Sequence, residues 1–246
     1  MREADRVDRR RECPGRTGHP RLGRAGPGRL PAPLRRGVRR RQAGRRRRFG
    51  GHHPHRAQHD HGSRSPPMDY IKGSGGIFRD CAVHDFDIVN WITGQRAVQV
   101  YATGIVQGNP LFAEYGDVDT AAVIVTFDGG ALGVVSNARY NARGYDCRLE
   151  VHGFDDSVVA GWDQGVPVRN TDPHNDFPTG PAHGFFMDRF TEAFRTELAA
   201  FVQVAKGGPV LGASVNDAVE VAWLAEAATE SLRRGAPVTI EEMRNA

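Results

Sequence analysis

Lysine, cysteine and long apolar runs are all scarce in this sequence of 246 residues. Its three cysteines, Cys13, Cys81 and Cys147, are odd in number and lack metal-ligand spacing, so they indicate neither a disulfide framework nor a zinc site. Free thiols are typical of a reducing compartment, and we therefore expect a cytoplasmic protein. No window approaches the roughly 18 apolar residues of a membrane span, and the N-terminus lacks the apolar stretch of a secretory signal, so we predict no membrane partner.

Residues 1–66 lack lysine, isoleucine, tyrosine and tryptophan, and Phe49 is their single aromatic residue. They carry 20 arginines against five acids, a balance of +15, whereas residues 67–246 carry 13 bases and 24 acids, a balance of −11. The first segment has too few apolar side chains to offset the entropy of ordering it. We predict that residues 1–66 are disordered and that residues 67–246 form the globular domain.

The arginine-rich segment has three possible interpretations. Runs such as Arg45-Arg46-Arg47-Arg48 would neutralise phosphates in a nucleic-acid-binding arm, although such arms usually mix lysine with arginine and interleave aromatic residues. The segment is otherwise a solvated tail, or the product of a shifted reading frame in a GC-rich gene, whose codons favour arginine, glycine and proline. Nothing fixes the geometry of the histidines between His52 and His61, so we predict no metal site.

Periodic patterns begin after Pro67. The spacing of apolar residues predicts a helix over Asp80–Thr93, ended by Gly94. Segments rich in valine, isoleucine and threonine then predict strands, and the Asp128-Gly129-Gly130 turn predicts a hairpin between two of them. The predicted strands are Ala97–Val106, Thr120–Phe127, Ala131–Arg139 and Asp146–His152.

Two helices complete the pattern. The first covers Phe186–Lys206 and carries one apolar stripe, and the second begins at a Ser214 cap and ends near Arg234, before Gly235. A short strand follows over Pro237–Ile240. A helix, a run of strands joined by a hairpin, and then helices predict an α+β domain on a largely antiparallel sheet.

Asp80 and His84 are four residues apart on the first predicted helix and therefore share a face, with Asp87 three residues beyond His84. A histidine flanked by carboxylates has a fixed tautomer and accepts protons near neutral pH, which suits general acid/base chemistry on an alcohol. The alternative interpretation is a helix-capping Asp80 and a core histidine. A metal site has little support, because no second histidine lies at ligand spacing.

The motifs of residues 67–246 resemble those of the Gfo/Idh/MocA oxidoreductases, in their myo-inositol 2-dehydrogenase branch. The likeness covers the segments Tyr70–Asp87, Gly116–Thr120, Ser136–Arg139, Gly144–Asp146 and Arg148–Gly153, with weaker likeness at Arg189-Phe190 and Glu197-Leu198.

The resemblance implies an N-terminal Rossmann domain that binds NAD and a C-terminal substrate domain. The second has a large open, mostly antiparallel sheet, which helices cover on one face and which supports a homo-oligomer. It further implies that His84 takes the proton of a cyclitol hydroxyl, that Asp80 orients His84 and the substrate, and that Tyr145 and Asp87 contact the substrate. A core or surface role for Tyr145 is the alternative.

The sequence departs from the family in having no strand–GxGxxG–helix unit and no lysine in the family's catalytic context. We therefore expect a truncated NAD-dependent cyclitol dehydrogenase that is inactive alone. The alternatives are a non-catalytic substrate-binding or oligomerisation module, another sugar dehydrogenase of the same family, and, least favoured, a nucleic-acid binder.

Overall fold

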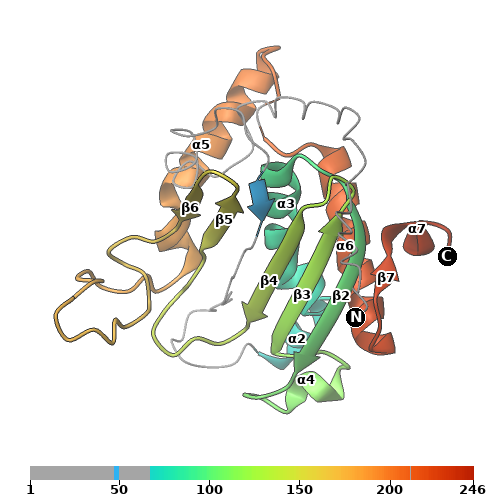
Figure 1. Cartoon of the computed structure of the whole chain (residues 1–246), viewed down its shortest axis with the longest axis horizontal. Helices are drawn as coiled ribbons and strands as arrows, with labels where there is room; N and C mark the ends of the chain where they lie inside the picture. The colour runs from blue at the N-terminus through green and yellow to red at the C-terminus, as the bar shows by residue number, and fades with distance from the viewer. Residues whose placement is uncertain (1–46, 50–66, 211) are drawn as a thin grey trace, which may run out of the picture.

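The computed structural model describes residues 47–49, 67–210 and 212–246 (Figure 1). The predicted disorder of residues 1–66 lies outside the described residues, apart from strand β1 at Arg47–Phe49. The helices are α2 (Met68–Gly73), the π-helix η1 (Phe78–Ala82), α3 (Val83–Thr93), α4 (Leu111–Glu114), α5 (Phe186–Ala205), α6 (Val215–Arg234) and α7 (Ile240–Arg244). The remaining strands are β2 (Ala97–Ile105), β3 (Thr120–Phe127), β4 (Leu132–Ala138), β5 (Leu149–Gly153), β6 (Ser157–Ala160) and β7 (Val238–Thr239).

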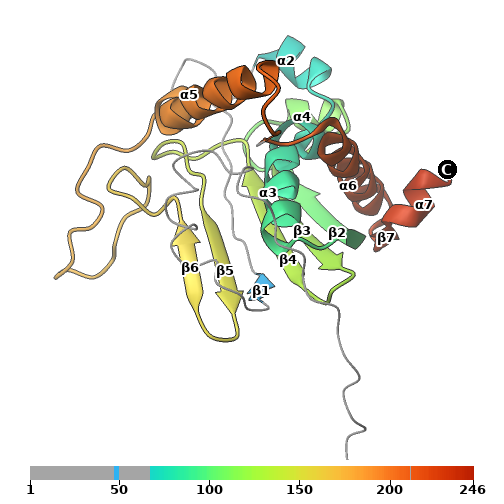
Figure 2. The ribbon, with the colours of Figure 1, turned by 90° about the horizontal axis from the view of Figure 1, so that it is seen from above.

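The centre of the fold is a four-stranded antiparallel sheet in the order β4-β3-β2-β7. Side chains along β3 alternate between buried and accessible, which is the two-residue period of a strand with one covered face. Helices α3 and α6 lie against that covered face (Figure 2). Figure 1 views the opposite face, and no described helix crosses it there.

A second, three-stranded sheet has the order β1-β5-β6, and its pairs are also antiparallel. The predicted α+β class with an antiparallel sheet and helices on one face is therefore confirmed. The described strands form two sheets rather than one large sheet, because residues 140–148 leave the end of β4 without regular structure before β5 begins.

The hydrophobic core lies between the central sheet and its two helices. Its fully buried members include Phe86 and Val89 of α3, Val100 of β2, Val123 of β3 and Leu224 of α6. Burial of such side chains contributes about 1.5–3 kcal/mol each, so this interface is the main source of stability. No helix in the described part of the chain is long and apolar enough to cross a membrane.

Several short elements differ from the sequence prediction. The predicted strand over Pro237–Ile240 is shortened to β7 at Val238–Thr239, and Ile240 begins helix α7, because Thr239 and Glu242 make a capping box. Helix α5 was predicted correctly, but Leu198, Phe201 and Val202 of its apolar stripe are exposed, in the half of the helix that extends past the ends of β5 and β6 (Figure 1).

Candidate active site

Asp80 lies in the π-helix η1, which runs directly into α3. A π-helical turn is rare and often occurs at functional sites, because its wider turn changes the direction of the side chains that it carries. Helix α3 ends at Gly94, whose φ of 61° lies in the left-handed region, which glycine adopts at little cost in free energy. The predicted Asp80–Thr93 helix is thus present, and Asp80 and His84 lie on either side of the junction between η1 and α3.

Both carboxylate oxygens of Asp80 are held by other side chains. Its Oδ1 accepts a hydrogen bond of 2.7 Å from the Tyr70 hydroxyl, and its Oδ2 pairs with Arg139 Nη1 at 2.5 Å. Burial and the hydrogen bond to Asp80 raise the pKa of Tyr70 above its ordinary value, so Tyr70 remains a donor at neutral pH. Asp80 is not the N-cap of its helix, because it lies inside η1, whose N-cap position is occupied by Ile77.

Arg139 is the buried centre of this network. Its side chain is 1% exposed, and its Nη2 pairs with Asp117 Oδ2 at 3.2 Å and lies 3.4 Å from Ser74 Oγ. The guanidinium also lies over the Phe112 ring, 5.2 Å from its centroid. Residues from the end of α2, from η1, from α4 and from the loop before β3 therefore converge on a single cation at the end of β4.

His84 is exposed on the first turn of α3, and Asp87 is half-buried one turn further along. The opposite side of the same turn is fixed to the sheet, where Asn137 Nδ2 of β4 donates a 2.7 Å hydrogen bond to Asp85 Oδ2. Both of these residues are 1% exposed. The helix that carries His84 is thus attached to β4 by a buried polar contact as well as by apolar packing.

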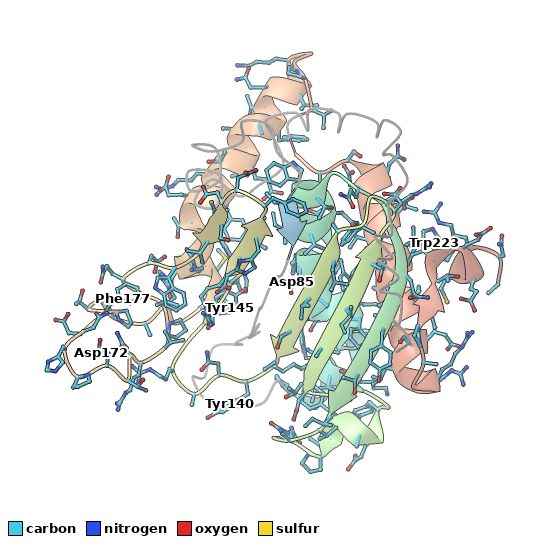
Figure 3. All side chains as sticks on the ribbon, viewed as in Figure 1. Asp85, Tyr140, Tyr145, Asp172, Phe177 and Trp223 are labelled. Carbon is cyan, nitrogen blue, oxygen red and sulfur yellow. The ribbon has the colours of Figure 1, made fainter. Side chains whose placement is uncertain are left out.

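Tyr145 is buried rather than open to solvent, at 5% exposure. It lies in the segment that leads into β5, and Asp85 lies beside β4 (Figure 3). The Tyr145 ring meets Phe190 edge-on at a centroid distance of 6.0 Å, and its amide donates to the His183 carbonyl. Burial, together with the neighbouring Cys147 and Asp85, raises the pKa of its hydroxyl above the ordinary value. Its role as a substrate contact stays a prediction.

The described residues do not fit a dinucleotide. A Rossmann-type site lies at the carboxyl ends of parallel strands, beside a glycine-rich turn and a helix N-terminus. Every strand pair within the described ranges is antiparallel. Across the same ranges, no group of three or more histidine, cysteine, aspartate or glutamate side chains is placed to hold a metal ion. The histidines between His52 and His61 lie outside the described residues.

Comparison with known proteins decides the family. The sequence profile of the GFO/IDH/MocA C-terminal domain matches residues 33–159. The chain belongs to the Gfo/Idh/MocA family. Among its relatives, the myo-inositol 2-dehydrogenase of Thermotoga maritima is 37% identical over 178 residues, which cover 72% of this chain and 53% of that protein. The scyllo-inositol 2-dehydrogenase (NAD(+)) of Bacillus subtilis is 36% identical over 182 residues, which cover 73% of this chain and 52% of that protein.

A solved structure in the same family supports the fold. The crystal structure of a myo-inositol dehydrogenase from Corynebacterium glutamicum superimposes with a TM-score of 0.68 at 31% identity, over 82% of this chain and 58% of that one. The Gfo/Idh/MocA chain described here spans about half the length of the curated relatives that it matches.

The sequence predicted Asp80, His84 and Asp87 as candidate site residues, which stays a prediction, and did not predict the residues that hold Asp80. Tyr70, Asp117 and Arg139 all lie in segments whose motifs carry the family resemblance. The available signal was Arg139, at the end of the predicted strand that became β4, together with Asp117 and Asp119 just before β3. It did not reveal the network, because the pairing spans 59 residues between Asp80 and Arg139.

Proposed function

We propose that this chain supplies the substrate-binding half of an NAD-dependent cyclitol dehydrogenase, in which Asp80 and His84 act on one hydroxyl of the substrate. The observation that carries the proposal is the fixed Asp80 carboxylate, one helical turn before an exposed histidine. The dehydrogenase names of the relatives support the substrate class, and they include both myo- and scyllo-inositol.

The proposed chemistry of this chain is proton transfer. His84 accepts the hydroxyl proton of the cyclitol as general base, since an imidazole titrates near neutral pH. Asp80 accepts hydrogen bonds from substrate hydroxyls on the 18% of its side chain that remains exposed, and Asp87 provides a second acceptor on the same helix. Oxidation also requires a hydride acceptor, which the described residues do not hold.

The NAD site therefore belongs to a separate domain that covers His84 when the enzyme is complete. An exposed general base works poorly, because catalysis of this kind depends on a site that excludes water. We expect the full chain alone to oxidise no cyclitol and to show no micromolar NAD binding by calorimetry. Saturable NAD binding by the chain would contradict this assignment. Neither Cys81 nor Cys147 forms a disulfide within the part of the chain that the structure describes, which supports a cytoplasmic location.

A fusion tests the proposed reaction. The dinucleotide-binding half of the Thermotoga maritima relative, joined to residues 67–246, is expected to oxidise myo-inositol with NAD. In this fusion, His84→Ala should lower kcat roughly 10²–10⁴-fold with little change in KM, because a general base acts in the transition state. Asp80→Asn should fold normally and lower turnover.

The matched control is His152→Ala, because His152 is another exposed histidine but lies on β5. Its turnover is expected to equal that of the unaltered fusion. Full activity of His84→Ala would remove His84 from the reaction. A fusion that binds NAD and cyclitol but never turns over would favour the non-catalytic binding module.

The open face of the central sheet supports a second part of the proposal, a homo-oligomer through this face. None of its outward side chains carries a charge, and Tyr101, Ile124 and Val134 form one apolar row across β2, β3 and β4. The outward residues are Gln99, Tyr101, Thr103, Ile105, Thr120, Ala122, Ile124, Thr126, Leu132, Val134, Ser136 and Ala138. An uncharged face can pair with a second copy of itself without burying unpaired charges.

Light scattering after size exclusion tests the oligomer. Ile124 is 42% exposed at the centre of the face, so Ile124→Lys should reduce the mass to that of a smaller assembly. Val159→Lys is the control, because Val159 is 44% exposed but lies on β6. A monomeric unaltered chain, or the same mass for both variants, would contradict an oligomer through this face.

A further inference from the structure

We infer that Arg139 is the residue that positions Asp80 for the substrate, and that the buried group Asp117–Arg139–Asp80 exists to hold that carboxylate in one orientation. The inference rests on the proposed function, since it assigns a purpose to the orientation of Asp80. Arg139 itself is too deeply buried, at 1% side-chain exposure, to touch a ligand. It is therefore a positioning residue.

The guanidinium is placed so that its two terminal nitrogens reach different carboxylates. Nη1 pairs with Asp80 Oδ2 and Nη2 with Asp117 Oδ2, while the Nε of Arg139 is buried with no hydrogen-bond partner. A buried N–H without a partner costs free energy. The fold tolerates this cost and keeps both terminal nitrogens on the acids, as expected if their orientation matters more than complete pairing of the arginine.

Asp117 fixes the arginine from the far side. Its Oδ1 accepts from the Ile77 amide at 2.9 Å, just before η1, and its Oδ2 accepts from Arg139. The backbone of Arg139 is held in turn, because its amide donates to the Asp119 carbonyl at 2.8 Å. The guanidinium therefore has little freedom to follow a moving Asp80.

The same contacts leave Asp80 able to bind a ligand. A carboxylate has about four lone-pair sites. Tyr70 uses one on Oδ1, and Oδ2 accepts from both Arg139 and the Cys81 thiol, whose sulfur lies at 3.8 Å. The side chain of Asp80 is nevertheless 18% exposed. Tyr70 and Arg139, which come from different elements, thus fix the plane of the carboxylate, and one acceptor site on Oδ1 stays available for a substrate hydroxyl.

The experiment measures myo-inositol binding to the full chain by calorimetry. It is done with the chain alone, and again with the separately produced dinucleotide-binding half of the Thermotoga maritima relative and NAD. Thermal unfolding of every variant is recorded in parallel. Arg139→Met is expected to raise the Kd for myo-inositol by about tenfold or more, and Arg139→Lys should regain part of the affinity because it restores one ion pair.

Arg189→Met is the matched control. Arg189 is also a buried arginine, at 6% side-chain exposure, with an ion pair to Asp163 at 3.3 Å and the Phe190 ring at 5.6 Å, and neither Asp80 nor His84 is among these partners. It should lose a similar amount of thermal stability, while its Kd changes less than about threefold. Equal changes of Kd in Arg139→Met and Arg189→Met would overturn the inference.

Two milder variants keep the test decisive if Arg139→Met fails to fold. Tyr70→Phe removes only the hydroxyl on Asp80 Oδ1, and Arg139→Lys keeps the buried charge. Both are expected to raise the Kd about threefold or more, and an unchanged Kd in both overturns the inference. Failure of the proposed function looks different, because the unaltered chain would then bind no myo-inositol under either condition.

Discussion

Ser231 offers a direct test of how α6 holds the central sheet. Within the described residues, strand β7 pairs with Gln99 and Val100 of β2, and this edge of β2 has no strand partner beyond them. At this edge the fully buried Ser231 replaces the missing strand partner. Its hydroxyl accepts a hydrogen bond from the Ala102 amide at 2.9 Å and donates one to the Ala236 carbonyl at 2.6 Å. One hydroxyl thus joins the edge of β2 to the end of α6.

Ser231→Ala removes both hydrogen bonds and leaves the buried Ala102 N–H and the carbonyl of the half-buried Ala236 without this partner. The buried N–H costs about 1–3 kcal/mol and the half-buried carbonyl about 1 kcal/mol, while the better helix propensity of alanine returns about 0.5 kcal/mol. We expect a loss of about 1.5–3.5 kcal/mol in the free energy of unfolding. In a domain of this size that loss corresponds to roughly 3–14 °C in Tm.

Urea unfolding of the full chain, followed by circular dichroism, measures this loss as a lower midpoint at unchanged slope. Thr229→Ala is the control on the same helix. Its hydroxyl donates to the Ala225 carbonyl, which is within a helix and needs no second donor. That variant should change stability by no more than about 0.5 kcal/mol. Equal losses in the two variants would refute the role given to Ser231.

Three further predictions concern stability. Burial raises the pKa of the Cys81 thiol from 9.0 to about 12, so the folded state keeps a proton that the unfolded thiol loses. The free energy of unfolding should therefore fall as the pH rises from 9 toward 12. In urea titrations, Cys81→Ala should make this fall less steep. Ser214→Ala breaks the capping box of α6 and should cost about 1 kcal/mol in the same assay, whereas a neutral result would show that the cap is dispensable. Leu224→Ala leaves a cavity in the core and should lower the free energy of unfolding by about 2–5 kcal/mol, whereas Val219→Ala should change it little because Val219 is 47% exposed.

The central elements could be predicted from the sequence because their signals are local. Strand β3 and helix α6 have the predicted bounds, since the first has a two-residue alternation between clear turns and the second has a serine cap and a terminal glycine. Gly235 adopts the left-handed φ of 64° that such a terminus requires. The hairpin after β3 also follows from its own turn residues, and Gly130 has a φ of 83°.

The short elements could not be predicted in the same way. Helices α2 and α4 have six and four residues, too few for a periodic pattern. The π-helical turn at Asp80 has no distinct residue signature and reads as part of an ordinary helix. The division of the strands into two sheets depends on the path of residues 140–148, which is set by tertiary contacts such as the bond from the Tyr145 amide to the His183 carbonyl.

The candidate site shows the same limit more sharply. The placement of Asp80 and His84 one turn apart follows from helical spacing, but the ionic partner of Asp80 comes from the end of β4 and is set by the packing of that strand against η1. Asp119 is a second example. Burial raises the pKa of its carboxyl, but backbone hydrogen bonds from Gln107, Gly108 and Asn109 outweigh burial and lower it. No local sequence pattern predicts that loop.

The two candidate functional groups are therefore held very differently. Asp80 has its oxygens fixed by Tyr70 and Arg139 within this chain, so its orientation is complete without another domain. His84 stands exposed on a helix whose other side is anchored through Asp85. The backbone of His84 is thus fixed while the residue stays exposed. A domain that brings the dinucleotide would have to supply the cover for that ring, and it would find the carboxylate already in place. On this view the chain carries the rigid half of the site, and exclusion of water from His84 is the contribution expected of the domain that binds NAD.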